Sequence, residues 1–498
     1  MKKYFLGLDQ GTTGTTAILF DENWNQISRG YREVQQIYPC SGWVEHDALD
    51  IWQSACYAVQ QAMDKAGATG SDIICIGVDH EGESVVLWDK LTGKPIYNAI
   101  VWQDRRTTGD AEVVMNQFGK LIRERTGLAV DSYFSALKLR WLLKNVPEAQ
   151  ELLAQNRLLA GNMDAWLLWK ITGGRCHATD PSTGSRTMLM NIITGEWDEE
   201  VLDALNIPLS ILPTIHDSAA IFGQADPESF CGISAPVSGV LNDQQAALFG
   251  QICFDPGTVK TTYGTGCFML MNTGEKPVYS NNGIITTAAW RINGRTSYAL
   301  DGGVYISGAA TQWLRDGLRI ISSASETEAM ALNAGSNGGV YFVPAFSGLA
   351  APYWDSYARG TMLGITGGTT REHIVRATLE ATAYQVNDLA QLMEKDSGVT
   401  INAMRCDGGA VANNFLMQFQ ADILGIPVYI PKITDTTALG SAYMAAIGAG
   451  FAASTDELRN NWQLDHAFEP CMSADERESL LADWHRAVDR ARAWAKKE

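Results

Sequence analysis

Residues 239–268 read GVLNDQQAALFGQICFDPGTVKTTYGTGCF, and this stretch decides how the chain is interpreted. An apolar run ends in a lone acid, Asp243, which is followed by two amides and a helix-forming run at 246–250. A Gly/Thr-rich turn follows at 262–267. Glycines let backbone N–H groups approach an anion closely. We therefore predict that Asp243 is the catalytic base of a phosphotransferase and that Gly264–Gly266 cradles nucleotide phosphates.

The length and charge of the chain limit its architecture and its partners. With 498 residues it exceeds the usual size of one hydrophobic core, so we expect two domains, residues 1–250 and residues 251–498. The formal net charge is −18, which argues against binding to nucleic acid, since that requires a basic surface. A nucleotide remains compatible, because local amides and Mg²⁺ can neutralise phosphates within one cleft.

The cysteines and the hydropathy indicate where the protein works. The nine cysteines are scattered and form no CxxC pair, which is typical of free thiols. No apolar run approaches the roughly 18 residues of a membrane-spanning helix, and the N-terminus carries no signal-peptide pattern. We expect a cytoplasmic protein without membrane association.

The N-terminus reads as a strand, a Gly/Thr turn and a second strand over residues 4–21. This hairpin differs from the strand–turn–helix of a Walker P-loop, and no GxxxxGK[ST] motif occurs. One interpretation places Thr12 and Thr13 at the phosphates and Asp9 near Mg²⁺. The alternative is an ordinary hairpin turn capped by Asp9. Further glycine turns at 264–266 and 407–410 favour the first interpretation.

A second candidate segment, residues 79–84, follows an apolar strand predicted at 73–78. It reads Asp-His-Glu-Gly-Glu-Ser, and four ionisable groups between two apolar strands must be solvated or belong to a site. A solvated turn remains the alternative. Metal binding through His80 is a weaker hypothesis, because the HExxH motif is absent. Trp102, after a strand predicted from Asn98, is either a core residue or a ring that packs against a ligand.

The second half of the chain repeats the pattern of the first. Strands predicted at 258–262, 297–304 and 403–406 each lead into a glycine-containing turn, and helices are predicted at 311–318 and 413–424. A strand–turn–strand near the start of each half indicates two related α/β halves that face a cleft.

Several long motifs in order resemble the FGGY family of carbohydrate kinases, and most closely its glycerol-phosphorylating members. The two family signatures match Tyr133–Asn145 and Gly360–Glu380, and further matches lie at 42–47, 98–106, 341–360 and 407–424. The resemblance implies an α/β fold of two actin/hexokinase-like (ribonuclease H-like) domains facing a catalytic cleft. It also implies ATP- and Mg²⁺-dependent phosphorylation of a small polyol or ketose. We further expect a homo-oligomer, a dimer or tetramer.

The resemblance assigns roles to individual residues. Asp243 matches the general base, and we place it with Asp9 at the Mg²⁺ position. The residues that match the polyol pocket are Glu83, Trp102, Tyr133, Gln244 and Phe268, with Gly82 and His80 beside them. The predicted nucleotide site comprises Thr12, Thr13, Gly264, Thr265, Gly308, Gln312, Gly409, Ala410 and Asn413.

The departures from the family pattern bear on the substrate. Gly82 stands where glycerol-phosphorylating members carry an arginine, Thr16 replaces a basic residue, and Asn242 replaces a glycine. Because Gly82 removes a donor and vacates volume, a four- or five-carbon substrate is expected, with His80 available to the extra hydroxyls. Glycerol is the alternative within the kinase hypothesis. A catalytically weak regulatory or binding protein on the kinase scaffold is the alternative outside it.

Overall fold

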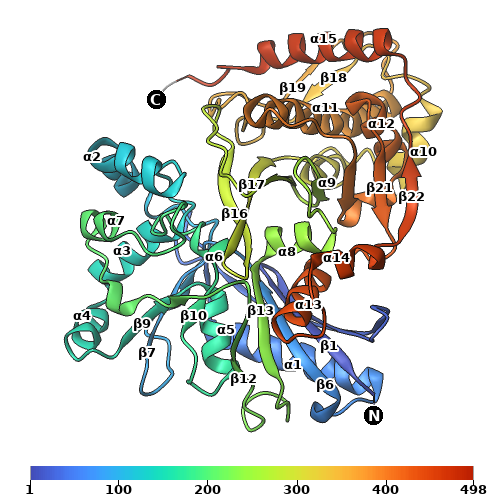
Figure 1. The fold of residues 1–498 in the computed structure, drawn as a ribbon. Helices are drawn as coiled ribbons and strands as arrows, with labels where there is room; N and C mark the ends of the chain where they lie inside the picture. The colour runs from blue at the N-terminus through green and yellow to red at the C-terminus, as the bar shows by residue number, and fades with distance from the viewer. Residues whose placement is uncertain (1, 497–498) are drawn as a thin grey trace.

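The computed structural model describes residues 2–496, which form two lobes that each surround a mixed sheet (Figure 1). The six-stranded sheet of the first lobe has the order β12-β13-β6-β1-β2-β3. β1 is antiparallel to β2 and parallel to β6, so the predicted N-terminal hairpin is confirmed. The strands are β1 (Tyr4–Gly11), β2 (Gly14–Phe20), β3 (Gln26–Glu33), β6 (Ile73–His80), β12 (Ala219–Gln224) and β13 (Pro236–Asn242).

The seven-stranded sheet of the second lobe repeats this arrangement, with the order β16-β17-β15-β14-β20-β21-β22. β14 is antiparallel to β15 and parallel to β20, as β1 is to β2 and β6. Each lobe therefore begins with a hairpin beside a parallel strand, as the sequence predicted. The strands are β14 (Val259–Tyr263), β15 (Cys267–Gly274), β16 (Ile285–Ile292), β17 (Arg295–Val304), β20 (Met404–Asp407), β21 (Val428–Pro431) and β22 (Leu464–Phe468).

One helix from the second half of the chain, α13 (Thr436–Gly448), packs on the sheet of the first lobe. Three glycines permit this contact, because a Cβ at Gly7, Gly77 or Gly239 would lie 2.0–2.3 Å from backbone atoms of α13. The helix backbone thus rests directly on β1, β6 and β13. Since α13 returns to the first lobe, the division of the chain at residue 250 stays a prediction.

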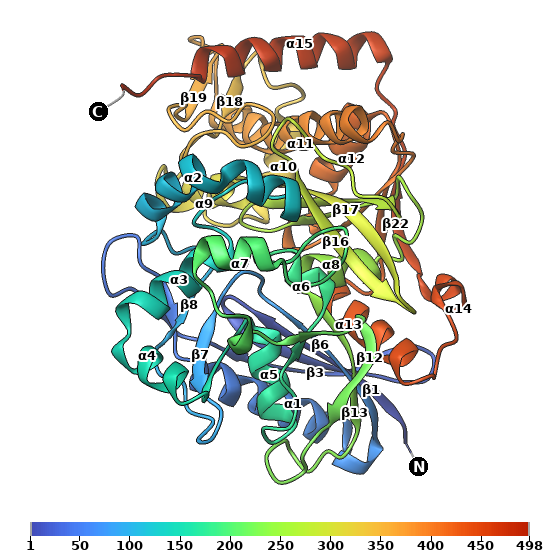
Figure 2. The same cartoon turned by 60° about the vertical axis from the view of Figure 1, so that its left-hand side comes forward.

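Helices cover both sheets and extend each lobe (Figures 1 and 2). In the first lobe they are α1 (Ala48–Ala66), α2 (Thr108–Thr126), α3 (Ser135–Asn145), α4 (Pro147–Ala154), α5 (Met163–Ile171), α6 (Pro181–Gly184), α7 (Glu199–Leu205) and α8 (Asp243–Gly250). In the second they are α9 (Gly308–Asp316), α10 (Glu326–Asn333), α11 (Arg371–Ser397), α12 (Asn414–Leu424), α14 (Thr455–Leu458) and α15 (Ala474–Ala491). In Figure 1, α8 lies between the two sheets.

The strand predicted from Asn98 needs correction, because it is only Ala99–Ile100. At the start of α3 the N-cap residue is Phe134, which makes no side-chain cap bond. Ser135, the first residue of α3, accepts a hydrogen bond from Asn162 Nδ2 at 2.9 Å. The C-terminal helix α15 is tied to α11, with Trp484 Nε1 donating to Asp388 Oδ2 at 2.8 Å.

Shorter strands complete the two lobes. They are β4 (Gln36–Ile37), β5 (Glu45–His46), β7 (Val86–Asp89), β8 (Ala99–Ile100), β9 (Leu158–Gly161), β10 (Ala178–Thr179), β11 (Thr214–Ile215), β18 (Tyr341–Val343) and β19 (Thr361–Leu363). Over residues 2–496, no helix combines the length and the apolar character that crossing a bilayer requires.

Candidate active site

Three acids meet where neighbouring strands of the first sheet end. Asp9 of β1 pairs in register with Asp79 of β6, and Leu241 of β13 pairs with Asp79 from the other side. Two residues after Leu241, Asp243 is the first residue of α8. The parallel strands β1, β6 and β13 therefore bring acids that are far apart in sequence to one edge of the sheet.

The acids influence one another's protonation. Burial raises the pKa of Asp9 to about 7, and the neighbouring Asp243 and Asp435 act in the same direction. Burial and the proximity of Asp9 raise the pKa of Asp79 well above its usual range. Burial also raises the pKa of Asp243, although the charges of Lys260 and His80 oppose the shift. This edge of the sheet thus concentrates three carboxyl groups whose pKa values are raised.

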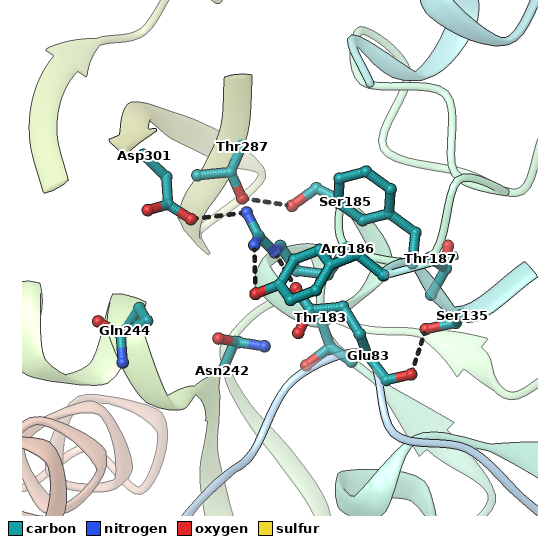
Figure 3. Close-up of polar contacts among 12 residues, drawn as sticks. Glu83, Ser135, Thr183, Ser185, Arg186, Thr187, Asn242, Gln244, Thr287 and Asp301 are labelled. Carbon is teal, nitrogen blue, oxygen red and sulfur yellow. Dashed lines mark hydrogen bonds and ion pairs between the residues drawn. The ribbon is translucent and has the colours of Figure 1, made fainter. Parts of the chain in front are cut away.

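A buried arginine, Arg186, connects the two lobes across the candidate polyol pocket (Figure 3). Its Nε donates to Glu83 Oε1 at 2.6 Å, its Nη1 to Asp301 Oδ2 at 2.8 Å and its Nη2 to Tyr133 Oη at 3.3 Å. Glu83 belongs to the first lobe, and Asp301 lies on β17 of the second. The sequence prediction missed Arg186, although a single cation in the otherwise uncharged run 181–195 was a usable signal.

The environment of Gly82 overturns one expectation. A Cβ built on Gly82 would lie only 2.2 Å from Nδ2 of Asn242, so the Asn242 side chain already fills that space. The prediction that Gly82 leaves room for a longer substrate is therefore wrong. The two departures from the family pattern, at 82 and 242, are in contact with each other.

His80 is also placed differently from the expectation that it meets extra hydroxyls. It is fully buried, and its Nδ1 lies 2.8 Å from the carbonyl of Glu81 while its Nε2 lies 2.9 Å from Thr183 Oγ1. The carboxylate of Glu81 is turned towards His46 at 3.3 Å. Because both ring nitrogens have protein partners, this geometry gives no support to a substrate contact by His80.

The remaining residues of the predicted polyol pocket come from both lobes. Trp102 is half-buried, its Nε1 donates to Thr12 Oγ1 at 2.9 Å, and its ring meets that of Tyr133 edge to face at 5.9 Å. Gln244 accepts a hydrogen bond from the buried Lys260 Nζ at 2.6 Å. Phe268 is half-buried on β15 opposite Gly303. Trp102 is therefore only partly buried, and its packing against a ligand stays a prediction.

A cavity of about 670 Å³ opens in the second lobe, bounded by the turn at 264–266, the start of α9 and the turn that contains Gly409. The turn at 264–266 is tied to the start of α9 by backbone bonds, from Gly308 N to Gly264 O at 3.1 Å and from Ala309 N to Thr265 O at 3.0 Å. The predicted nucleotide residues that line the cavity are Gly264, Thr265, Gly308, Gln312, Gly409, Ala410 and Asn413. The sequence prediction missed other lining residues, among them Thr311, Arg315, Glu328 and Leu379.

Thr12 and Thr13 do not line this cavity within the described part of the chain. They form the exposed turn between β1 and β2, where Thr12 meets Trp102. Beside this hairpin, Arg29 of β3 donates from Nη2 to Thr16 Oγ1 at 3.2 Å and lies 3.5 Å from Asp435. Thr16, which replaces a basic residue of the family pattern, therefore has the guanidinium of Arg29 next to it.

The fold and the two facing sites define a class of two-lobed phosphotransferases, and comparison with known proteins identifies the family. Residues 4–250 match the N-terminal domain and residues 259–449 the C-terminal domain of the FGGY family of carbohydrate kinases, to which this chain belongs. The predictions of the family, of its two-domain α/β fold and of an ATP-dependent kinase with an alcohol group as acceptor are confirmed.

Three relatives illustrate the similarity. Glycerol kinase 2 of Thermotoga maritima is 53% identical over 496 residues, covering 99% of this chain and 100% of that protein. Glycerol kinase of Symbiobacterium thermophilum is 54% identical over 495 residues, covering 99% of both. The crystal structure of Plasmodium falciparum glycerol kinase with ADP superposes with a TM-score of 0.91 at 35% identity, covering 98% of both chains.

Proposed function

We propose that this protein transfers the γ-phosphate of ATP to a hydroxyl of a small, uncharged polyol, with Asp243 as the general base. The observation that carries the proposal is the position of Asp243 at the start of α8, which lies between the sheets of the two lobes (Figure 1). A carboxylate beside the attacking hydroxyl suits proton acceptance, while phosphoryl transfer otherwise depends on positioning and charge neutralisation.

On the polyol side, Glu83, Trp102, Tyr133, Gln244 and Phe268 surround the substrate in this proposal. Arg186 fixes Glu83 and the Tyr133 hydroxyl, so these groups face the substrate in a set geometry. On the nucleotide side, the glycine turns at 264–266 and 408–409 leave backbone space for the nucleotide. We place the hairpin residues Thr12 and Thr13 at the terminal phosphates of ATP. These phosphates reach from the nucleotide site of the second lobe towards Asp243.

The acidic edge fits a Mg²⁺ ion held by Asp9 and Asp243. A cation there would offset the burial and the neighbouring carboxylates that raise the pKa of Asp9 to about 7. Two carboxylates suffice as protein ligands, because Mg²⁺ typically takes one or two carboxylates plus phosphates and water. When bound, Mg²⁺ supplies neutralisation of the phosphate charge.

For the substrate, a three-carbon polyol is now the first candidate. The full-length relatives are named glycerol kinases, and Asn242 fills the space that had argued for a longer substrate. A cytoplasmic location and a dimer or tetramer stay predictions.

A phosphorylation screen tests the proposal. ATP consumption is measured with three- to six-carbon polyols and ketoses at matched concentrations. We expect glycerol to be phosphorylated with a kcat/KM at least equal to that of any four- or five-carbon compound. A tenfold preference in kcat/KM for a longer compound would support the expectation of a four- or five-carbon substrate. Absence of turnover with every compound would instead favour the binding-protein alternative.

A further inference from the structure

We infer that Asn242 is a specificity-determining residue that makes the substrate-hydroxyl contact which residue 82, a glycine, cannot make. The inference rests on the proposed function and concerns the same pocket. Asn242 is the last residue of β13 and directly precedes Asp243. A side chain at 242 therefore lies next to the carboxylate assigned as the base.

The Nδ2 group of Asn242 is buried without a hydrogen-bond partner among residues 2–496. The residue is 2% exposed, and no group among residues 2–496 bonds its Nδ2. Buried amide groups in folded proteins are almost always paired, because an unpaired one loses its bonds to water without replacement. An unpaired amide beside the catalytic carboxylate indicates that a ligand supplies the missing partner.

The backbone and neighbours of Asn242 hold it at the pocket. Its backbone N donates to Ser182 Oγ at 2.9 Å, which fixes the end of β13. In Figure 3 the carboxamide lies between Gln244 and Glu83, two residues of the predicted polyol pocket. The two ends of a carboxamide are nearly equal in size, so a half-turn presents either an N–H donor or an oxygen acceptor. A hydroxyl can pair with both.

Asn242 and Gly82 depend on each other. Any side chain at 82 would begin 2.2 Å from Asn242 Nδ2, so a residue larger than glycine at 82 requires the Asn242 side chain to move. Where the family pattern has an arginine at position 82 and a glycine at position 242, this chain has a glycine and an asparagine. A neutral amide thus takes the place of a cation. The buried cations beside this pocket, Arg186 and Lys260, already have protein partners: Arg186 is matched by Glu83 and Asp301, and Lys260 Nζ donates to Gln244 Oε1 and Thr262 Oγ1. The pocket is therefore suited to uncharged polyols and not to sugar acids.

The test is a double-mutant cycle with glycerol as the probe, comparing wild type, Asn242→Gly, Gly82→Arg and the double variant. We expect Asn242→Gly to lower kcat/KM for glycerol about tenfold, with the KM for ATP within twofold of wild type. Gly82→Arg alone is expected to lose more than tenfold, because its Cβ meets Asn242. The double variant should recover at least tenfold over Gly82→Arg, a non-additivity that only contacting residues produce.

A packing role is separated from a hydrogen-bonding role by Asn242→Leu, which has a similar volume and no polar group. If Asn242 only packs against Gly82, Asn242→Leu keeps wild-type kcat/KM and the inference is overturned. If it binds the hydroxyl, Asn242→Leu loses kcat/KM by at least as much as Asn242→Gly. Calorimetric binding of glycerol should weaken in parallel, and a normal melting temperature shows that each variant is folded.

The outcomes also separate this inference from the proposed function. If the wild-type protein neither phosphorylates nor binds glycerol or any other polyol, both the proposed function and the inference on Asn242 are wrong. If wild type is active while Asn242→Gly, Asn242→Leu and the double variant match it, only the inference falls. Phosphorylation of gluconate with a kcat/KM equal to that of glycerol would overturn the preference for uncharged substrates.

Discussion

The proposed polyol site, or polyol face, and the proposed nucleotide site, or nucleotide face, are built by different means. The polyol face consists of interlocked side chains, with Arg186 bonded to Glu83 and Asp301 and with Asn242 seated on Gly82. The nucleotide face consists largely of glycine turns joined by backbone bonds around an open cavity of about 670 Å³. Backbone recognition depends on conformation alone, whereas side-chain recognition depends on which residue occupies each position.

This difference explains where the chain departs from its family. The glycine turns keep the family pattern, and two of their glycines are tightly packed: a Cβ on Gly308 would lie 2.6 Å from the carbonyl oxygen of Gly264, and one on Gly408 would lie 2.5 Å from that of Tyr263. The polyol face tolerates exchange, provided that the partners change together, as at 82 and 242. The predictions that follow test whether the two faces respond differently to substitution.

The largest effect is expected from Asp243→Asn on the polyol face. Loss of a general base typically lowers the rate by about 10²–10⁴-fold, so kcat should fall by that factor while nucleotide affinity stays within twofold. Steady-state kinetics and calorimetric titration with ADP measure the two quantities. Asp203→Asn, at an exposed acid on α7, is the control and should leave both unchanged. A variant that keeps more than a tenth of wild-type kcat would remove Asp243 from the base role.

A large loss of stability is expected from Arg186→Ala. It leaves Glu83 and Asp301 as buried, unpaired carboxylates, and breaking a buried ion pair in this way costs about 3–5 kcal/mol. Thermal and denaturant unfolding measure the change. The matched control is Arg125→Ala, whose pair with Glu200 at 2.7 Å is solvent-exposed and should contribute less than about 1 kcal/mol. Equal losses in the two variants would contradict the role of Arg186 as a buried bridge between the lobes.

A smaller, pH-dependent effect is expected at Asp9. Its pKa is raised in the folded state, so the folded chain retains a proton that the unfolded chain has lost between about pH 4 and pH 7. The charged carboxylate therefore lowers stability progressively over that interval and remains unfavourable above it. We expect Asp9→Asn to unfold at a higher temperature than wild type at pH 8, with a gain of about 1–3 kcal/mol. The gain should vanish near pH 4, while activity is lost throughout. A stability difference that is the same at pH 5 and pH 8 would show that the acid cluster is not its cause.

The smallest effect is expected on the nucleotide face from Gly308→Ala. The new Cβ would lie 2.6 Å from the carbonyl of Gly264, so the two turns must separate by a fraction of an ångström. We expect the KM for ATP to rise about tenfold, which corresponds to about 1.4 kcal/mol, with the KM for glycerol unchanged. Gly109→Ala on α2 is the control, because its Cβ meets nothing within 4 Å. If Gly308→Ala raised the KM for glycerol more than the KM for ATP, the division between the two faces would be wrong.

The sequence by itself determined the strand–turn–strand openings of both lobes, the position of Asp243 between strand and helix, and the glycine turns that line the nucleotide cavity. These features are local: alternation, turn residues and caps act over a few neighbouring positions, so they can be recognised without knowing the rest of the fold. The sequence motifs likewise fixed the family. The α13 packing on the first sheet was not predicted, because it depends on glycines that lie on three separate strands.

Only the tertiary structure decided what compensates for the residues that seemed to be missing. The sequence comparison counted Gly82 and Thr16 as lost cationic groups and the space above Gly82 as empty. In the fold, Asn242 occupies that space, Arg29 reaches Thr16 from the adjacent strand β3, and Arg186 holds Glu83 from across the pocket. The physical reason is that a side chain of this length reaches several ångströms from its own backbone. The groups that complete a site therefore come from strands and loops that are distant in sequence, and their positions are set by strand order and packing.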